Sequence, residues 1–220
     1  SDLPKNDRYY LEFQGANSTA TVFLNGAKIG NHDGGYSTWK INITDVINTN
    51  NELCVFVDNA PNDAVYPQKA DFTFYGGLYR KVRLIGVDLP CIDPDENGAN
   101  GIFVTPKIKE NDAVVEVQCK LLGDDSLNNI CYTIFDADKN VVISEKSKNP
   151  FCKLRIPGVH LWQGKKDPYL YTIQVSLFSD ETETDRIETR FGCRSFFVDP
   201  DKGFFLNGEA CCSICYNVIY

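Results

Sequence analysis

The amino-acid sequence predicts an all-β protein built from two β-sandwiches in series. Short runs that alternate apolar and polar side chains recur along nearly the whole chain, which is the period of a strand with one buried face. Turn-forming residues separate these runs. No segment keeps an amphipathic helical period over about 11 residues. The 220 residues are enough for two ordinary domains, each with its own core.

The first half begins with an expected strand at residues 9–14. A hairpin follows, in which Asn25-Gly26 joins residues 19–24 to residues 27–30. Asn-Gly is typical of a type I′ turn because both central residues of that turn need a positive φ. We therefore expect a tight antiparallel pair here.

Three further alternating runs complete the first half, at residues 39–43, 53–57 and 81–87. In the second of these runs Cys54 and Phe56 make the alternate face apolar as well, so we expect that strand to be covered on both faces. In the third run we expect Val82 and Leu84 to face inward.

Residues 88–101 interrupt the strand pattern with two Pro, two Gly and four acids, and they are the best domain boundary. The second half then repeats the strand pattern at residues 115–121, 130–134, 141–144, 154–156, 171–177 and 191–198. Several short strands within about 100 residues are typical of an immunoglobulin-like sandwich, although the Cys…Trp…Cys spacing of antibody domains is absent. In the last segment Asn207-Gly208 opens a second hairpin.

Composition excludes several classes of function. The net charge is −8 and Lys165-Lys166 is only a pair, so no basic cluster is present and we expect no nucleic-acid partner. No apolar run approaches the roughly 18–20 residues that span a bilayer, so we expect no membrane partner. The nine Cys are odd in number and irregular in spacing, which favours buried free thiols over a disulfide framework. A reducing, cytoplasmic location follows, with secretion or a periplasmic location as the alternative.

Candidate catalytic groups are few. His32 and His160 fall in different halves, and no Gly-x-Ser-x-Gly elbow is present. We expect His32 to be a solvated turn residue and His160 to be packed in a loop. Glycoside hydrolysis needs a pair of carboxylates held close together, and no pair stands out. The residues alone therefore indicate a non-catalytic pair of sandwiches.

Metal and cofactor signals are weak. The acidic run 93–98 imitates the start of a calcium loop, but Val104 occupies the twelfth position, where such a loop needs a bidentate Glu. Cys212 and Cys215 form one C-x-x-C pair, whereas tetrahedral zinc needs four ligands. We expect an acidic linker, no metal site and no cofactor.

The segment from Asp71 to Arg80 is the most informative part of the chain. It holds four aromatic residues, one carboxylate and a Gly-Gly break, and it leads directly into an expected strand. An aromatic loop held between strands suits contact with a sugar face or with a partner domain.

Several segments, in order, resemble glycoside hydrolase family 2, the family of β-galactosidases, β-glucuronidases and β-mannosidases. They are residues 10–15 and 20–26, residues 32–36 and 43–47, the aromatic segment 71–80, residues 161–162, 168–171 and 191–194, and residues 202–209. The Gly-Gly motif before Leu78-Tyr79-Arg80 favours β-galactosidase-like members of the family. The resemblance implies an intact retaining enzyme with two catalytic Glu on a (β/α)8 barrel. This chain is expected to stop before that barrel, so we assign no catalytic residue and expect no turnover.

The resemblance also implies a domain assignment. Residues 1–90 would form a galactose-binding-like jelly roll that lacks its first strands, residues 91–198 an immunoglobulin-like sandwich, and residues 199–220 the start of the barrel region. The absence of Met fits a piece of a longer protein. Missing strands would leave an open sheet edge, so we expect a homo-oligomer.

The family's aromatic loop approaches the sugar site, and Asp71 matches its acidic residue. The resemblance thus implies that Asp71 accepts hydrogen bonds from sugar hydroxyls in the intact enzyme, with Phe72 and Tyr75 shaping the wall. The alternative is that Asp71 caps the loop. The expected partner is a carbohydrate, specifically a galactoside. The alternative functions are a free-standing carbohydrate-binding or adhesion module and an interaction scaffold that binds no sugar.

Overall fold

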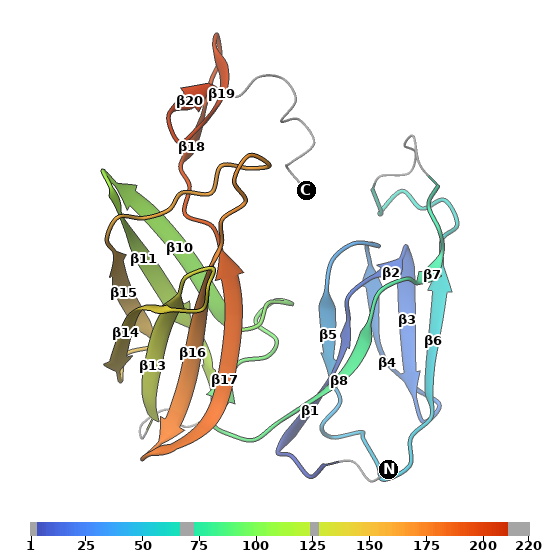
Figure 1. Cartoon of the computed structure of the whole chain (residues 1–220). Coiled ribbons are helices and arrows are strands. Elements are labelled where there is room, and N and C mark those ends of the chain that lie inside the picture. The colour runs from blue at the N-terminus through green and yellow to red at the C-terminus, as the bar shows by residue number, and fades with distance from the viewer. Residues whose placement is uncertain (1–3, 67–72, 124–127, 211–220) are drawn as a thin grey trace. The chain divides into compact units, whose positions relative to one another are not determined.

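The computed structural model describes residues 4–66, 73–123 and 128–210, and within these ranges it contains strands and turns but no helix. The chain divides into two compact units, Ser1–Asn100 and Gly101–Tyr220 (Figure 1). The predicted all-β class is confirmed. In the described ranges nothing has the length and apolar character of a membrane-crossing helix.

The first unit contains two three-stranded antiparallel sheets. One sheet has the order β5-β1-β8, with β1 at Arg8–Phe13, β5 at Trp39–Asn42 and β8 at Val82–Val87. The other has the order β4-β3-β6, with β3 at Thr19–Leu24, β4 at Ala27–Asp33 and β6 at Leu53–Asp58. A small pair joins β2 (Ala16–Asn17) to β7 (Gly77–Leu78), and β9 is at Cys91–Ile92. This arrangement is a sandwich, because both sheets contribute to one core.

The core of the first unit follows the alternation in the sequence. Phe13 from β1 and Val22 from β3 are completely buried in the same apolar cluster. Trp39 from β5 stacks on Phe13 with ring centroids 4.5 Å apart. The predicted hairpin is confirmed, since Asn25 and Gly26 have φ values of 53° and 82° and join β3 to β4.

Two expectations about this unit need correction. Strand β6 is not covered on both faces, because Phe56 is 64% exposed and Cys54 is exposed. Val82 and Leu84 lie opposite buried Phe13 and Leu11, as predicted, yet they are 37% and 43% exposed. These exposures arise because β6 and β8 are outermost in their sheets among the described residues. Side chains on an outermost strand have a neighbouring strand on one side only.

The second unit is a sandwich of a three-stranded and a four-stranded sheet. The first has the order β10-β11-β15, with β10 at Ile102–Lys109, β11 at Asp112–Cys119 and β15 at Phe151–Ile156. The second has the order β14-β13-β16-β17, with β13 at Asn128–Phe135, β14 at Val141–Ser147, β16 at Tyr171–Ser179 and β17 at Thr182–Phe191. Strand β12 is at Leu121–Leu122. This architecture agrees with the predicted immunoglobulin-like sandwich.

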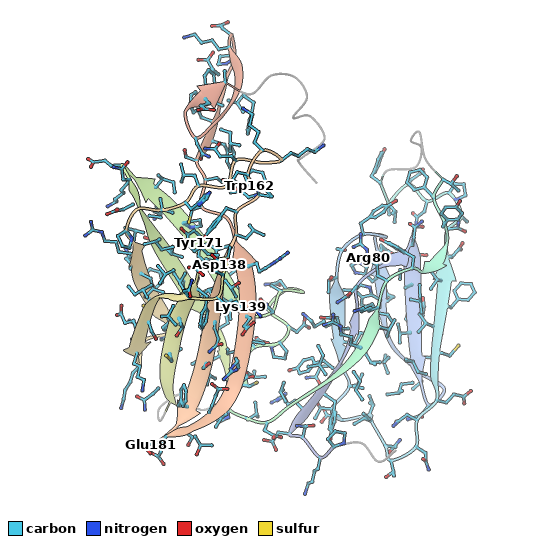
Figure 2. The ribbon with its side chains drawn as sticks, viewed as in Figure 1. Arg80, Asp138, Lys139, Trp162, Tyr171 and Glu181 are labelled. Carbon is cyan, nitrogen blue, oxygen red and sulfur yellow. The ribbon has the colours of Figure 1, made fainter. Side chains whose placement is uncertain are left out.

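Alternation again separates core from surface. Val115 and Leu154 from one sheet and Tyr132 and Ile173 from the other are completely buried. Trp162 lies in the connection between β15 and β16, and Tyr171 begins β16 (Figure 2).

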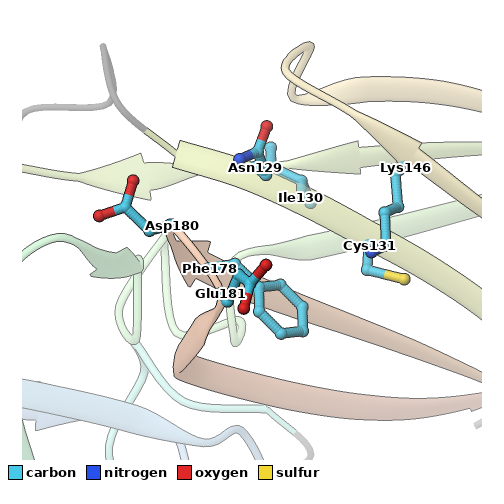
Figure 3. Close-up of a pocket in the computed structure, with 7 residues that line it drawn as sticks. All are labelled: Asn129, Ile130, Cys131, Lys146, Phe178, Asp180 and Glu181. Atoms are coloured by element: carbon cyan, nitrogen blue, oxygen red, sulfur yellow. The ribbon is translucent and has the colours of Figure 1, made fainter.

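Other side chains of the four-stranded sheet lie on its outer face, away from this core. Asn129 on β13 lies directly opposite Phe178 on β16 (Figure 3). Neither residue belongs to the buried core of the unit.

A small hairpin sheet ends the described chain, with β18 at Phe196–Asp199, β19 at Gly203–Leu206 and β20 at Glu209–Ala210. The second predicted Asn-Gly turn is confirmed, with φ values of 51° at Asn207 and 82° at Gly208. The expected strand at 191–198 is wrong in extent, because β17 ends at Phe191 and β18 begins at Phe196. The sequence pattern does not predict β10 and β17.

Candidate functional site

The aromatic segment lies only partly within the described residues. Asp71 and Phe72, two of the three predicted site residues, lie outside them. Tyr75, the third, is described, and its side chain is 75% exposed. The carbonyl oxygen of Tyr75 accepts a hydrogen bond of 2.9 Å from the Asn17 side-chain amide. The backbone at Tyr75 is therefore fixed while the ring faces solvent.

The Gly-Gly break has a local physical reason. Gly77 pairs with Asn17 in the β2–β7 ladder and has a φ of 103°, a conformation that favours glycine. A Cβ atom at Gly76 would lie 2.8 Å from the exposed Asn59 side chain, so a larger residue there would displace that side chain. The two glycines thus turn the aromatic loop back against β2.

Tyr79 and Arg80 anchor the end of the loop. The Tyr79 hydroxyl donates a hydrogen bond of 2.5 Å to the carbonyl oxygen of Gly35. Arg80 donates from Nη1 to the carbonyl oxygens of Tyr36, at 3.0 Å, and Gln14, at 3.3 Å. The Arg80 guanidinium also lies 5.1 Å from the Tyr79 ring centroid. Arg80, labelled in Figure 2, therefore holds three backbone segments together.

Three exposed tyrosines lie at these contacts. We call them the tyrosine face: Tyr36, Tyr75 and Tyr79. The rings of Tyr36 and Tyr79 meet edge to face at 6.3 Å, and each is about two-fifths exposed. Asn17 connects the parts, because it binds the Tyr75 carbonyl and its side chain lies against Gly35. Desolvation is the main cause of a raised Tyr79 pKa, so its hydroxyl stays protonated near pH 7 and remains a donor.

The tyrosine face exposes both aromatic surface and hydroxyl groups. Exposed aromatic faces pack against the apolar C–H face of a sugar ring, while tyrosine hydroxyls and nearby backbone groups exchange hydrogen bonds with its hydroxyls. Sequence reasoning named Tyr75 as a site residue but did not name Tyr36, Tyr79 or Asn17. Tyr36 and Tyr79 fall within segments that already carried the family resemblance, whereas no pattern singled out Asn17.

The two histidines lie in different units, and each has its own partners there. His32 is not a solvated turn residue as expected: it lies in β4, stacks on Trp39 at 4.9 Å and shares a 3.0 Å hydrogen bond with Ser37 Oγ. Desolvation lowers the His32 pKa, so the ring is neutral near pH 7. His160 packs in a loop, with Nε2 at 2.6 Å from Asp167 Oδ2 and its ring stacked on Tyr169.

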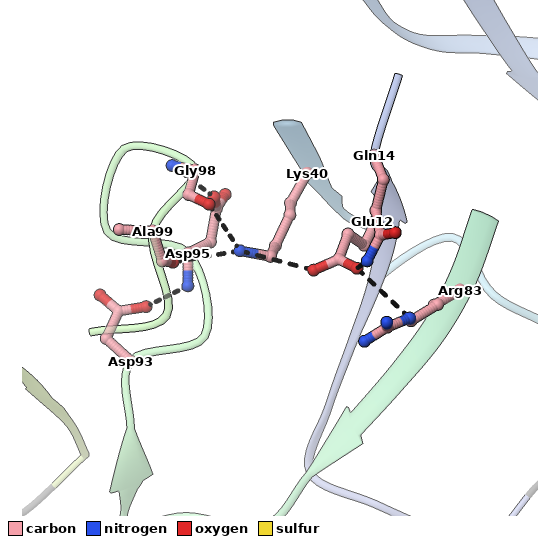
Figure 4. A network of polar contacts seen from close by, with 8 residues as sticks. All are labelled: Glu12, Gln14, Lys40, Arg83, Asp93, Asp95, Gly98 and Ala99. Atoms are coloured by element: carbon pink, nitrogen blue, oxygen red, sulfur yellow. Dashed lines mark hydrogen bonds and ion pairs between the residues drawn. The ribbon is translucent and has the colours of Figure 1, made fainter. Parts of the chain in front are cut away.

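The acidic run 93–98 forms a loop that is held by hydrogen bonds within it and by hydrogen bonds from a lysine (Figure 4). Asp93 accepts from the backbone amide of Asp95, and Asp95 accepts from the backbone amide of Gly98. Lys40 Nζ donates to the carbonyl oxygens of Gly98, at 2.9 Å, and Ala99, at 3.1 Å. An ammonium group therefore occupies the position where the loop could present oxygens to a cation. No group of three or more metal-ligating side chains occurs in the described part of the chain.

Comparison with known proteins defines the class. Residues 1–82 match the family model described as "Glycosyl hydrolase 2 galactose-binding domain-like". Residues 99–194 match the model described as "Glycosyl hydrolases family 2". The two matches leave only residues 83–98 and 195–220 uncovered. The chain belongs to glycoside hydrolase family 2, and the resemblance in the sequence is confirmed.

Individual relatives carry two different names. A β-glucuronidase of Bacteroides fragilis is 33% identical over 93% of this chain, and a β-galactosidase of Thermoanaerobacter pseudethanolicus is 27% identical over 93%. Among solved structures, an FMN-binding β-glucuronidase from "Facaelibacterium prausnitzii L2-6" superimposes with a TM-score of 0.86 at 36% identity over 96% of this chain. A putative β-galactosidase from Bacteroides fragilis gives 0.80 at 31% identity over 93%.

This chain spans about a third of the length of those relatives: 31% and 28% of the two sequences, and 34% and 33% of the two structures. It corresponds to their N-terminal β-sandwich domains. A non-catalytic portion of a glycoside hydrolase fits this chain.

Proposed function

We propose that this chain supplies the two β-sandwich domains that shape the rim of the sugar site in an intact retaining glycoside hydrolase acting on β-galactosides. The tyrosine face is the observation that carries the proposal. Hydrogen bonds fix the backbone at Tyr36 and Tyr75 and the hydroxyl of Tyr79, and a preorganised surface binds a sugar with less loss of entropy. Under this proposal the chemistry belongs to the rest of the enzyme.

Asp71 completes the proposal. Its carboxylate accepts hydrogen bonds from sugar hydroxyls, while Phe72 and Tyr75 form an apolar wall. A charged acceptor matched to a hydroxyl contributes more than a neutral one, because the bond is charge-assisted. Loss of such a bond in the transition state lowers kcat/KM by about tenfold or more.

The experiment uses the intact parent enzyme with chromogenic β-galactoside and β-glucuronide substrates. We expect Asp71→Ala and Tyr75→Ala to lower kcat/KM for the galactoside. Asp45→Ala, which removes an exposed carboxylate from another part of the same unit, is the control and should have no effect. Unchanged kcat/KM in both test variants would contradict the proposed role of the loop. If the variants lose kcat/KM mainly for the glucuronide, the site is retained but its substrate is a β-glucuronide.

We also propose self-association through an open sheet edge. Val82 and Leu84 on β8 carry apolar surface that faces the core side yet remains more than one-third exposed. An outer strand with such side chains offers unpaired backbone groups to a second strand. We expect the 220-residue chain to sediment as a dimer or larger, and Leu84→Lys to shift it toward the monomer. A monomer at high concentration would contradict this proposal.

We also propose a cytoplasmic location, because the buried cysteines that the structure describes form no disulfide. Cys119, Cys152 and Cys193 are buried and free, which suits a reducing compartment. Fractionation of source cells tests this location, and recovery of the protein outside the cytoplasm would refute it.

A further inference from the structure

The second unit contains a pocket of about 460 Å³ that is unrelated to the tyrosine face (Figure 3). It lies beside the turn that joins β16 to β17. The side chains that define its chemistry come from three strands and that turn: Asn129 and Cys131 on β13, Lys146 on β14, Phe178 at the end of β16, and Asp180 and Glu181 in the turn.

Strand register places these side chains on the outer face of the sandwich. Asn129 lies opposite Phe178, and Cys131 lies opposite Lys146. The intervening Ile130 points the other way and is 1% exposed in the core. The pocket is therefore part of the solvent-facing surface and opens outward beside the turn.

The polar groups of the pocket are available for a ligand. Among the described residues, the side chains of Asn129, Asp180 and Glu181 have no hydrogen-bond or ion-pair partner. Lys146 Nζ lies 6.0 Å from the centroid of the Phe178 ring, so an ammonium donor stands beside an aromatic surface. Two carboxylate acceptors, an amide and an ammonium donor thus surround one aromatic ring.

This combination selects a polyhydroxylated ligand with an apolar face. A pocket of this volume lies within the usual range of small-molecule sites, about 300–1,000 Å³. Carboxylates accept the O–H groups of a sugar, the amide can donate and accept, and the ring packs against sugar C–H groups. Two negative charges against one positive charge disfavour an anionic sugar.

We propose that this pocket is a second, non-catalytic binding site for a neutral saccharide. The sugar ring packs on Phe178. Asp180 and Glu181 accept hydrogen bonds from its hydroxyl groups, and Asn129 and Lys146 donate hydrogen bonds to its oxygens. The site lies on the immunoglobulin-like sandwich and does not depend on the tyrosine face. It would hold a carbohydrate chain to the protein whether or not the parent enzyme cleaves it.

Nuclear magnetic resonance titration of the ¹⁵N-labelled 220-residue chain with lactose tests the proposal. We expect saturable shifts of the backbone amides of Asn129, Lys146 and Phe178, with a millimolar Kd. Asp180→Asn and Glu181→Gln should each weaken binding about five- to tenfold, because a charged acceptor becomes neutral. Asp180 has a φ of 53°, which Asn also tolerates, so the turn should persist.

Glu110→Gln is the matched control, because Glu110 has a φ of 54° in the turn between β10 and β11, outside the pocket. It should leave the Kd unchanged. Absence of saturable shifts at the three amides, an unchanged Kd in both pocket variants, or tighter binding of glucuronate than of lactose would each overturn the proposal. Shifts confined to Tyr75 and Tyr79 would also overturn it, while supporting the separate role of the tyrosine face.

Discussion

The ammonium group of Lys40 lies 2.9 Å from the carbonyl oxygen of Gly98, a contact that joins residues 58 positions apart. Its side chain is only 3% exposed, and Glu12 Oε2 is 3.9 Å from the same nitrogen. One buried lysine therefore satisfies two loop carbonyls and faces a buried carboxylate. The acidic run after β9 is thereby held on the first sandwich.

Lys40→Met tests this anchoring. The substitution leaves Glu12 with Gln14 and the half-exposed Arg83 as partners and leaves two carbonyls without their donor. We expect the first unit to lose about 2–4 kcal/mol of unfolding free energy. Urea unfolding followed by Trp39 fluorescence in a Trp162→Phe background measures the first unit alone, since the chain has two Trp and one lies in each unit.

Two companion variants make the Lys40 test specific. Lys28→Met removes an exposed lysine from β4 and should change the unfolding free energy little. Adding Glu12→Gln to Lys40→Met should recover part of the loss, because the buried carboxylate is then neutral. A loss no larger than that of Lys28→Met would show that the Lys40 contacts contribute nothing.

Arg80→Ala should loosen the tyrosine face. It removes the donor to the carbonyl oxygens of Tyr36 and Gln14, and we expect a loss of about 1 kcal/mol because the site is exposed. Hydrogen exchange should rise at the amide of Gln14, which donates a 3.0 Å hydrogen bond to the carbonyl oxygen of Lys81. Arg80→Lys keeps the charge but loses the planar guanidinium. Its unfolding free energy and its exchange rate should therefore lie between those of the unchanged protein and Arg80→Ala. Unchanged exchange at the Gln14 amide in Arg80→Ala would contradict the anchoring role.

Local sequence signals predicted much of this architecture. Asn25-Gly26 and Asn207-Gly208 both form the expected turns. These turns need a positive φ at two adjacent residues, and Asn and Gly adopt a positive φ more readily than other residues. By contrast, β17 escaped prediction. Its side chains are mostly polar, and it is a strand because it pairs with β16 along its whole length. Tertiary pairing there outweighs the local pattern.

The candidate site was less predictable than the fold. Tyr75 was found within one local segment, but its contact with Asn17 spans 58 residues and the contact of Tyr79 with Gly35 spans 44. No periodicity in a single sequence encodes which distant backbone amide or carbonyl completes a loop. The exposure of Phe56 was missed for the same reason, since strand order decides whether a β-strand is outermost.

The cysteines should differ sharply in reactivity. Burial raises the pKa of the Cys119 thiol to about 12 and those of Cys152 and Cys193 to about 11, so these thiols are protected and protonated. Cys54 is exposed on β6, contrary to the expected burial. We expect iodoacetamide to label Cys54 in the native protein and the three buried thiols only in urea. Peptide mass mapping identifies the labelled sites, and native labelling of Cys119 ahead of Cys54 would contradict the structure.

Acid should weaken the second unit through Glu116. Hydrogen bonds from Lys107 and Lys153, with Lys107 first, lower the Glu116 pKa below its ordinary value of 4.5. A carboxyl whose pKa is lower in the folded state stabilises that state above its unfolded pKa. This contribution is lost as the pH falls from 4.5 through the lowered value. Glu116→Gln should therefore reduce the melting temperature of the second unit at pH 7 but change it little near pH 3. Glu110→Gln, on a neighbouring turn without such partners among the described residues, is the control. An equal effect of Glu116→Gln at both pH values would show that the ion pairs do not carry the pH dependence.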